Sequence, residues 1–268
     1  MAVRNLPPAA ACADPVALAR RLERAEAEQL ACTGAPGFAG ALAIAGGLAV
    51  SKGPRSASSA AFGLGLAGPV SAPDLDRIEA HLGAVGGDVR IELCAHADPS
   101  LGVELARRGY RLDRFLQVLV RPVSLGRPPV RGGARLVHPG EERAWADTFS
   151  LAHLGSAPAS DEEAEDLLAI PRTAGNACFA AFDGEALAAV ALVSAHDGVA
   201  ELSGAGVLPA FRGRGLHLGL VNARLAWAAA QGCDLAASAV EPGGASQRNL
   251  EKVGFRVAYP KVVMVRGG

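Results

Sequence analysis

Several features that mark common protein classes are missing from this sequence of 268 residues. The cysteines are odd in number, far apart in the chain and never arranged as Cys-x-x-Cys (Cys12, Cys32, Cys94, Cys178 and Cys233). This pattern suits the reduced thiols of a cytoplasmic protein better than a disulfide framework. The six histidines show no metal-ligand spacing, so we expect no metal site.

A long uninterrupted hydrophobic segment is also lacking. The most apolar window, Phe38 to Val50, has 13 residues and is rich in glycine, whereas a membrane-spanning helix needs about 20 apolar residues. We predict that this window forms a buried strand. The N-terminus does not show the charged, apolar and small-residue succession of a signal peptide. We therefore expect a cytoplasmic protein with no membrane partner.

Charge of one sign is neither in excess nor concentrated. The formal net charge is -1, and almost all the cations are arginine. No basic run could cover a phosphate backbone, and the Arg-Gly-Gly copies at 131–133 and 266–268 are isolated. We therefore expect no nucleic-acid partner and find RNA binding a poor alternative. A chain that is half hydrophobic and one-fifth charged predicts a globular protein, and its length suits two domains.

What the sequence does contain is a repeat, with its copies 145 positions apart. The segment SLGVELARRGYRLDRFLQVLVR after Pro99 aligns without gaps on ASQRNLEKVGFRVAYPKVVMVR, so that Gly109 falls on Gly254. Each copy is typical of a short helix that ends at a glycine and is followed by a strand. A further helix and strand are predicted before each copy, at 74–84 and 89–94 and at 216–231 and 235–240. We interpret the chain as two similar α/β units in tandem, with chance similarity of short segments as the alternative.

The two copies differ at a basic, glycine-rich stretch. Arg212-Gly213-Arg214-Gly215 falls on Ala67-Gly68-Pro69-Val70, which has no cation and has a proline where a backbone donor would be needed. We predict that the first unit cannot hold a phosphate at this position. The stretch from Pro122 to Gly133 is rich in proline and glycine and suits a linker. The predicted domains are residues 1–125 and 130–268.

The second unit shows the pattern of an antiparallel meander. Apolar runs at 178–182, 187–195 and 199–208 are separated by Asp183-Gly184 and Asp197-Gly198, which favour tight turns. Two helices are predicted before them, at 141–154 and from Ser160 to Pro171. The third run contains Gly204 and Gly206, which indicate a bulge or a close approach of a ligand.

The third run leads through Pro209 into the basic glycine turn and an apolar helix that starts at Gly215 and can end at Gly232. A strand, a glycine turn and a helix N-terminus direct several backbone N–H groups and the positive end of the helix dipole at one point. This arrangement predicts an anion site.

The arrangement resembles the GCN5-related N-acetyltransferase (GNAT) family, whose central motif runs from a splayed strand into Arg/Gln-x-x-Gly-x-Gly/Ala at a helix start. Here the motif reads Arg212-Gly213-Arg214-Gly215-Leu216-His217 and follows Val207-Leu208-Pro209. The resemblance continues into SQRNLEKVGF at 246–255, which is similar to the family's last helix and its Lys-x-Gly-Phe ending. It covers about the last 135 residues, and the first unit only as a degenerate copy.

The resemblance implies an α/β (α+β) GNAT fold, with a mixed, mostly antiparallel central sheet flanked by helices, in two tandem units. It also implies that acetyl-CoA binds with its pantetheine arm along the splayed strand and its diphosphate at the turn, without a metal. Ser246 and Asn249 match positions that face the cofactor arm, with a helix N-cap and plain solvent exposure as the respective alternatives. The implied cofactor-binding residues are Val207, Leu208, Arg212, Gly213, Arg214, Gly215, Leu216, His217, Ser246 and Asn249.

Two positions depart from the family's pattern. His217 stands where the family usually has glycine or alanine, so that its side chain either crowds the diphosphate or forms a hydrogen bond to it. Leu250 stands where many members carry a tyrosine that protonates the departing thiolate. That role must be filled elsewhere or not at all.

Attack of an amine on a thioester needs a neutral amine, a polarised carbonyl and a tolerable leaving group. Family members often use a glutamate on the splayed strand as the base, which here is Glu201, on the same face as Ser203, Ala205 and Val207 by simple alternation. An exposed strand-end glutamate is the equal alternative. The Leu208 N–H is expected to polarise the carbonyl. Tyr259 is the candidate acid, with a core or edge aromatic as the alternative.

The sequence therefore predicts an acetyl-CoA-dependent N-acyltransferase that transfers an acetyl group to a primary amine of a small molecule by direct attack on the thioester. The alternative is a catalytically weak acyl-CoA-binding module with a regulatory or scaffolding role, which the leucine at position 250 and the silent first unit favour. Acetyl and longer acyl donors, and a monomer and a homodimer, are equally compatible with the sequence.

Overall fold

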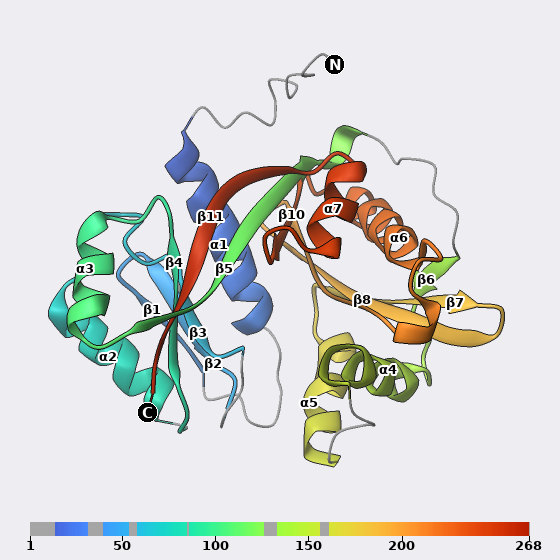
Figure 1. Ribbon diagram of the computed structural model, residues 1–268, viewed down its shortest axis with the longest axis horizontal. Helices are drawn as coiled ribbons and strands as arrows, with labels where there is room; N and C mark the ends of the chain where they lie inside the picture. Colours follow the sequence, from blue (N-terminus) through green and yellow to red (C-terminus); the bar gives the residue numbers. More distant parts are fainter. Residues whose placement is uncertain are drawn as a thin grey trace.

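The computed structural model describes residues 14–31, 40–53, 58–84, 86–125, 133–155 and 161–267. Within these ranges, 11 strands form one continuous sheet, and helices cover both of its faces (Figure 1). No helix in the described ranges is long and apolar enough to span a bilayer. Most of the predicted linker and the Ser160 cap lie outside the described residues.

The first unit begins with a helix that the sequence did not reveal. Its elements are α1 (Pro15–Ala31), β1 (Gly40–Ile44), β2 (Gly47–Ser51), β3 (Ala60–Phe62), α2 (Ala72–Gly83), β4 (Val89–Cys94), α3 (Pro99–Arg107), β5 (Arg111–Pro122) and η1 (Val123–Leu125). The prediction of a single strand over the apolar window was wrong, because β1 and β2 form an antiparallel hairpin there. Ala45 and Gly46 make the turn with φ of 51° and 77°, and glycine adopts such positive φ values readily.

The second unit contains the predicted meander. Its elements are β6 (Ala134–Leu136), α4 (Glu142–Leu154), α5 (Asp161–Arg172), β7 (Asn176–Asp183), β8 (Ala186–His196), β9 (Val199–Val207), η2 (Pro209–Phe211), α6 (Leu216–Ala230), β10 (Leu235–Val240), α7 (Ala245–Lys252) and β11 (Arg256–Arg266). Strands β7, β8 and β9 pair antiparallel in succession. Phe179 packs in the core beneath α6, whereas its neighbour Cys178 packs with the residues of α4. The two helices therefore cover opposite faces of the meander.

The two units exchange their last strands. The sheet order is β1-β2-β3-β4-β11-β5-β10-β9-β8-β7-β6, so that β11 lies between β4 and β5 of the first unit. In turn, β5 pairs with β10 of the second unit and with β11, all antiparallel. Figure 1 shows the two exchanged strands side by side across the middle of the molecule, with α1 behind them. Each half of the sheet is thus completed by a strand from the other half.

Helix α1 covers the junction between the two halves. Its Leu22 packs in one core cluster with Val118 of β5, Tyr259 of β11 and Val199 of β9. This cluster contains residues of both units, whereas separate clusters lie beneath α6 and beneath α2 and α3. The mixed α/β class and the mostly antiparallel sheet confirm the predicted fold.

Candidate active site

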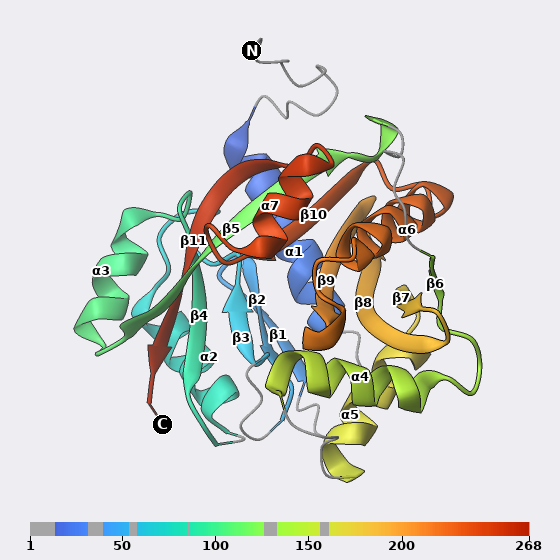
Figure 2. The same cartoon turned by 45° about the vertical axis from the view of Figure 1, so that its right-hand side comes forward.

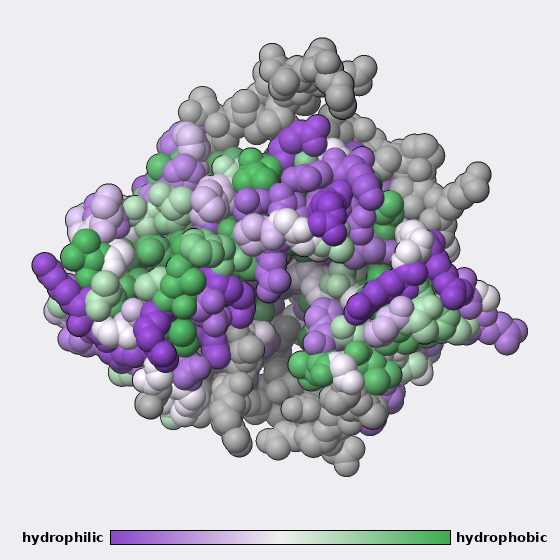
Figure 3. Space-filling view, in the orientation of Figure 1, coloured by the Kyte–Doolittle hydropathy of each residue, from purple (hydrophilic) through white to green (hydrophobic). Residues whose placement is uncertain are grey.

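A cavity of about 720 Å³ opens where β9 runs into α6. Helices α4 and α7 form the other walls, and Figure 3 shows this face of the molecule hollowed between them. The lining includes Lys252 of α7 and eight residues that the sequence predicted as cofactor ligands, namely Val207, Arg212, Gly213, Gly215, Leu216, His217, Ser246 and Asn249. Leu208 and Arg214 are not among the residues that line it.

The turn before α6 leaves the helix N-terminus free to bind an anion. Gly215 is the N-cap, with φ of 81° and ψ of 0°, and no side chain caps the helix. Gly213 also has a positive φ, of 80°, and a Cβ there would meet nothing within 4 Å. The first N–H groups of α6 have no partner within the helix, and the dipole favours negative charge at this end. The glycines of the motif are thus required by the backbone conformation of the turn.

The two arginines of the motif point in different directions. Arg212 is exposed, lines the cavity and donates from Nε to the Val207 carbonyl at 3.3 Å. Arg214 forms an ion pair with Asp183 at the end of β7 and lies over the ring of Phe211. The expectation that both guanidinium groups face the phosphates is therefore not met by the geometry. Arg212 and Lys252 are the cations at this cavity.

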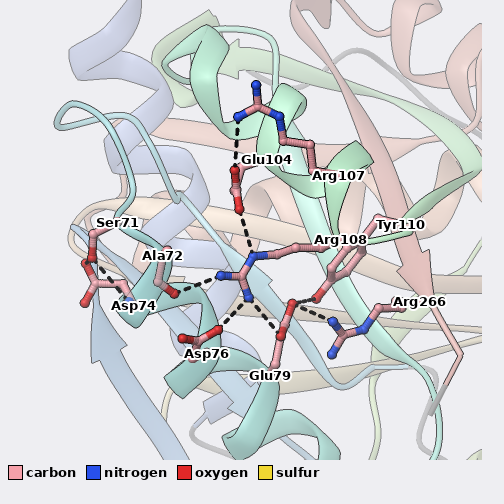
Figure 4. A network of polar contacts seen from close by, with 10 residues as sticks. All are labelled: Ser71, Ala72, Asp74, Asp76, Glu79, Glu104, Arg107, Arg108, Tyr110 and Arg266. Atoms are coloured by element: carbon pink, nitrogen blue, oxygen red, sulfur yellow. Dashed lines mark hydrogen bonds and ion pairs between the residues drawn. The ribbon is translucent and has the colours of Figure 1, made fainter.

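The corresponding position in the first unit is closed by polar contacts. Figure 4 shows this region, where Ser71 Oγ accepts a hydrogen bond from the Asp74 backbone N–H at 3.3 Å and so caps α2. Arg108 donates to the Ala72 carbonyl at 3.1 Å. The hollow beside α2 measures only about 280 Å³, and Glu104 lines it. A capped helix end beside a carboxylate disfavours a phosphate, which supports the predicted contrast between the units.

Strands β9 and β10 separate and create a second cavity. They pair in parallel only where residues 235–237 face 199–201, and they diverge beyond Ala237, as Figure 2 shows beside α6 and α7. A cavity of about 530 Å³ fills the gap, and Ser203 and Ala239 lie on its two sides. It shares several lining residues with the first cavity, namely His153, Ala205, His217, Ala245 and Ser246. The two cavities therefore adjoin and form a path from the α6 N-terminus to the gap in the sheet.

The backbone groups of β9 that face the gap include those of Val207 and not the N–H of Leu208. The Leu208 N–H donates to the Ala188 carbonyl of β8 at 3.0 Å. It is therefore not available to polarise a thioester, and that expectation was wrong. Because alternate residues of a strand direct their N–H and C=O groups to opposite neighbours, Ala205 and Val207 face the gap toward β10. These residues suit the predicted pairing with a pantetheine arm.

A bulge in β9 explains its two glycines. The pairing register with β8 shifts at Gly204, which has a φ of 56°. A Cβ on Gly204 would lie 2.8 Å from the ring of Phe149, and a Cβ on Gly206 would lie 2.6 Å from Ala152. The glycines therefore allow helix α4 to pack closely against β9. The contact is with this helix and not with a ligand, whose close approach we expected as the alternative to a bulge.

The bulge also changes which side chains share a face. Ala205 and Val207 pack against the core beneath α6, whereas Glu201 is influenced by Glu26 and Lys261 on the α1 side. Simple alternation had placed Glu201 on the same face as Ala205 and Val207, and this was wrong because an extra residue in a bulge inverts the alternation.

A buried arginine stabilises the bulge. Arg224 of α6 is 1% exposed and donates to the Leu192 carbonyl of β8 at 3.1 Å and to the Ser203 carbonyl of β9 at 3.2 Å. Burial lowers its pKa to about 9, against the opposing effect of Glu201. Arg224 lines the gap between β9 and β10. The sequence analysis missed this residue, although a single arginine on an otherwise apolar helix was a usable signal.

The two residues predicted as catalytic lie beneath α1. Glu201 is 4% exposed and accepts a hydrogen bond from the backbone N–H of Ala239, and burial raises its pKa well above the usual range. Tyr259 is 3% exposed and donates to Glu23 Oε1 at 2.9 Å. Neither side chain lines the two cavities. Glu201 is connected to the gap between β9 and β10 through Ala239, which donates a hydrogen bond to it and lines that gap. Tyr259 has the geometry of a core aromatic, which was the alternative for this residue.

Two histidines stand where the cavities meet. His153 stacks on Phe149 with ring centroids 4.3 Å apart, and its Nδ1 lies 3.3 Å from the Phe149 carbonyl oxygen. A carbonyl can only accept, so that Nδ1 carries the proton and Nε2 keeps its lone pair. Burial lowers the pKa of His217 to about 4, which leaves its imidazole neutral near pH 7.

The site contains no candidate metal centre. Among the described residues, no group of three or more histidines, cysteines, aspartates or glutamates is placed to hold a metal ion.

Comparison with known proteins identifies the second unit. Residues 142–255 match the acetyltransferase (GNAT) family model, whereas no curated protein matches the sequence. A GCN5-related N-acetyltransferase from Kribbella flavida shares the fold with a TM-score of 0.64 and 18% identity, over 94% of this chain and 96% of that one.

Two further structures show the extent of the similarity. A tandem GNAT protein from the clavulanic acid biosynthesis pathway covers 96% of both chains, with a TM-score of 0.58 and 16% identity. A GCN5-related N-acetyltransferase from Sphaerobacter thermophilus has a TM-score of 0.56 and 19% identity, over 72% of this chain and 64% of that one. Residues 142–255 thus match the GNAT acetyltransferase family model, and the chain shares its fold with solved GNAT structures, one of which is a tandem GNAT protein.

Proposed function

We propose that this protein transfers an acetyl group from acetyl-CoA to a primary amine of a small molecule. The observation that carries the proposal is the pair of adjoining cavities that extend from the uncapped N-terminus of α6 to the gap between β9 and β10. Bound acetyl-CoA supplies the activated acyl group. The chain supplies a turn for the diphosphate at one end of the path and a gap in the sheet at the other.

Backbone N–H groups and cationic side chains of the cavity both contribute to binding of the diphosphate. The backbone N–H groups of Gly215, Leu216 and His217 donate hydrogen bonds to the diphosphate. Arg212 and Lys252 add positive charge. Charge-assisted hydrogen bonds contribute about 1.5 to 3 kcal/mol each, so that three or four account for the roughly 8 kcal/mol of micromolar binding after ordering costs.

The last helix completes the proposed binding site for the arm. Gly244, not Ser246, is the N-cap of α7. The Ser246 hydroxyl therefore lies within the first turn of the helix, on the cavity lining together with Asn249. Both side chains suit hydrogen bonds to the amide groups of the pantetheine arm.

A binding test separates the site from the rest of the helix. Gly215→Val places a branched side chain at a φ of 81° at the cavity, and we expect calorimetry to show at least a hundredfold loss of CoA affinity. Gly232→Val is the matched control, because Gly232 has a φ of 75° beyond the other end of α6 and no atom within 4 Å of its Cβ position. If the wild-type protein binds no CoA at millimolar concentration, the proposed function is wrong.

Glu201 is the proposed acceptor of the amine proton. Burial raises the pKa of Glu201 well above its usual range, so that this carboxylate takes up a proton more readily than an exposed one. Glu201 accepts a hydrogen bond from Ala239, which lines the gap. We expect Glu201→Gln to lower kcat by tenfold or more while CoA affinity stays within about twofold of the wild type. Thiol release and calorimetry measure the two quantities. Unchanged turnover would remove Glu201 from the mechanism.

A regulatory acyl-CoA-binding module is the second candidate. Leu250, at the position of the tyrosine acid in many family members, is 2% exposed and packs in the core beneath α6. No acid therefore stands at this position. Incubation with acetyl-CoA and a panel of amines, followed by titration of released thiol, distinguishes the candidates: the enzyme releases thiol in an amine-dependent way, and the module does not.

A further inference from the structure

A third cavity, of about 250 Å³, lies on the α1 side of the exchanged strands. Both units contribute to it. Glu26 of α1, Glu92 of β4 and Arg114 of β5 come from the first unit, and Ala239 of β10 and Val263 of β11 come from the second. It shares Leu116 and Ala239 with the gap between β9 and β10. A molecule held there therefore meets the thioester end of the path from the side opposite to the cofactor.

The sheet register sets the spacing of opposite charges in this cavity. Val263 of β11 pairs with Glu92 on one side and with Arg114 on the other. Because neighbouring strands are 4.7 to 4.9 Å apart, the Cα atoms of Glu92 and Arg114 are separated by about 10 Å. Arg90 lies two residues before Glu92 on β4 and lines the same cavity. Carboxyl and guanidinium groups thus line the same small cavity from strands about 10 Å apart.

The carboxylates exceed the buried cations beside them. Lys261 Nζ lies 2.5 Å from Glu26 Oε2, 2.5 Å from Glu92 Oε2 and 3.6 Å from Glu23 Oε1. The lysine side chain is fully buried, so that one ammonium group serves three carboxylates. Glu201 adds a fourth acid near this group, and Arg224 is the cation that faces it. Burial and the neighbouring acids raise the pKa of Glu26 to about 8, so that a further cation placed beside this group would be stabilised as Glu26 loses its proton.

The guanidinium groups have partners that a ligand can replace. Arg90 pairs with Asp88 at 3.4 Å, and Arg114 pairs with its neighbour Asp113 at 3.0 Å. The aspartate side chains are 47% and 40% exposed, and such surface pairs contribute little to stability. A carboxylate from a ligand forms stronger, bidentate contacts with an arginine.

We propose that the acceptor is a small amphoteric amine, such as an amino acid, with its amine at Glu26 and Glu92 and its anionic group at Arg90 and Arg114. The proposal rests on the acetyl-transfer function proposed above. A cavity of this size holds a molecule of amino-acid dimensions and excludes an oligosaccharide or a folded partner. In the reaction, the amine nitrogen forms a bond to the acyl carbon as the C–S bond breaks. The bound ammonium group loses one proton to Glu26 before the attack and a second proton to Glu201 as the C–S bond breaks, and the thiolate leaves and is protonated by solvent.

Matched pairs of acceptors test the proposal. We would measure thiol release with acetyl-CoA and alanine, β-alanine or glutamate, each against its carboxamide. We expect kcat/KM to be at least tenfold higher for the acid of a pair. Arg114→Gln should remove this preference by raising KM for the acid alone. Arg111→Gln, an exposed change on the same strand outside the cavity, is the control and should keep the preference.

Binding of the same pairs to the CoA-saturated protein, measured by calorimetry, gives a second readout. The proposal is overturned by equal turnover and equal affinity for acid and carboxamide, by a preference that survives Arg114→Gln, or by the absence of any binding or turnover across the pairs. A protein that fails to bind CoA itself would instead contradict the proposed function, so that the two failures are distinguishable.

Discussion

At the scale of single residues, the glycines of β9 and of the α6 turn have different physical reasons. Gly213 and Gly215 are needed for positive φ values at an open, uncapped helix end. Gly204 combines a positive φ with close packing against Phe149, and Gly206 is needed for packing alone. One pattern of repeated glycines thus serves both the proposed phosphate turn and the contact between a helix and a strand.

Gly206→Ala tests the packing role. Its Cβ would lie 2.6 Å from Ala152 Cβ and 2.7 Å from His153 Cε1, so that α4 must move away from β9. We expect a loss of about 1 to 3 kcal/mol in the free energy of unfolding, as for other overpacked sites, measured by urea denaturation. Gly133→Ala, whose Cβ would meet nothing within 4 Å, is the control. Equal stability of the two variants would show that α4 is not held tightly against the strand.

At the scale of elements, α1 carries acids on the face that it buries. Glu23 is 1% exposed on this helix, and Glu26 contacts the buried Lys261 of β11. Burial raises the pKa of Glu26 to about 8, although Lys261 opposes the shift. A carboxyl whose pKa is raised in the folded state favours folding at a pH below its unfolded value of 4.5, and this stabilisation is lost as the pH rises toward 8.

Glu26→Gln should therefore flatten the pH dependence of stability. One proton that is held only in the folded state corresponds to about 1.4 kcal/mol per pH unit. We expect the wild type to lose free energy of unfolding between about pH 5 and about pH 8, and the variant to lose less. Urea denaturation across this range measures the slopes. Glu165→Gln, a surface change on α5 at a residue paired with Arg172, is the control and should keep the wild-type slope.

At the scale of the whole molecule, the exchange of β5 and β11 makes the two units depend on each other. The second unit without β5 would lack the strand between β10 and β11, and the first unit without β11 would lack the neighbour of β4. Unpaired strand edges favour aggregation. The cavity proposed for the acceptor is also incomplete in either half, because α1, β4 and β5 come from the first unit and Ala239 comes from the second.

A chain divided between Leu125 and Gly133 tests this dependence. We expect each fragment alone to aggregate or remain unfolded, and the two fragments expressed together to form one complex that binds CoA. Circular dichroism, size-exclusion chromatography and calorimetry provide the readouts. A second fragment that alone is monomeric, unfolds cooperatively and binds CoA with the affinity of the intact chain would contradict the expectation.

The sequence by itself determined most elements of the second unit and the turn before α6, because these depend on local chemistry. Asp183-Gly184 and Asp197-Gly198 favour tight turns wherever they occur, and Gly213 and Gly215 favour positive φ in any context. The internal repeat was sufficient to predict two similar units. The motif of the second unit was sufficient to predict the α/β fold that the structure confirms.

Only the tertiary structure decided which strands pair and which side chains meet. The alternating pattern of β5 and β11 is the same whichever neighbour they pair with, so that the exchange cannot be read from the sequence. In the sequence, the charged residues of α1 have the pattern of a solvated surface. Only the folded structure places Lys261, which is 235 residues further along the chain, against Glu26. The bulge at Gly204, the pairing of Arg214 with Asp183 and the burial of Tyr259 likewise depend on contacts between distant segments, which no local pattern specifies.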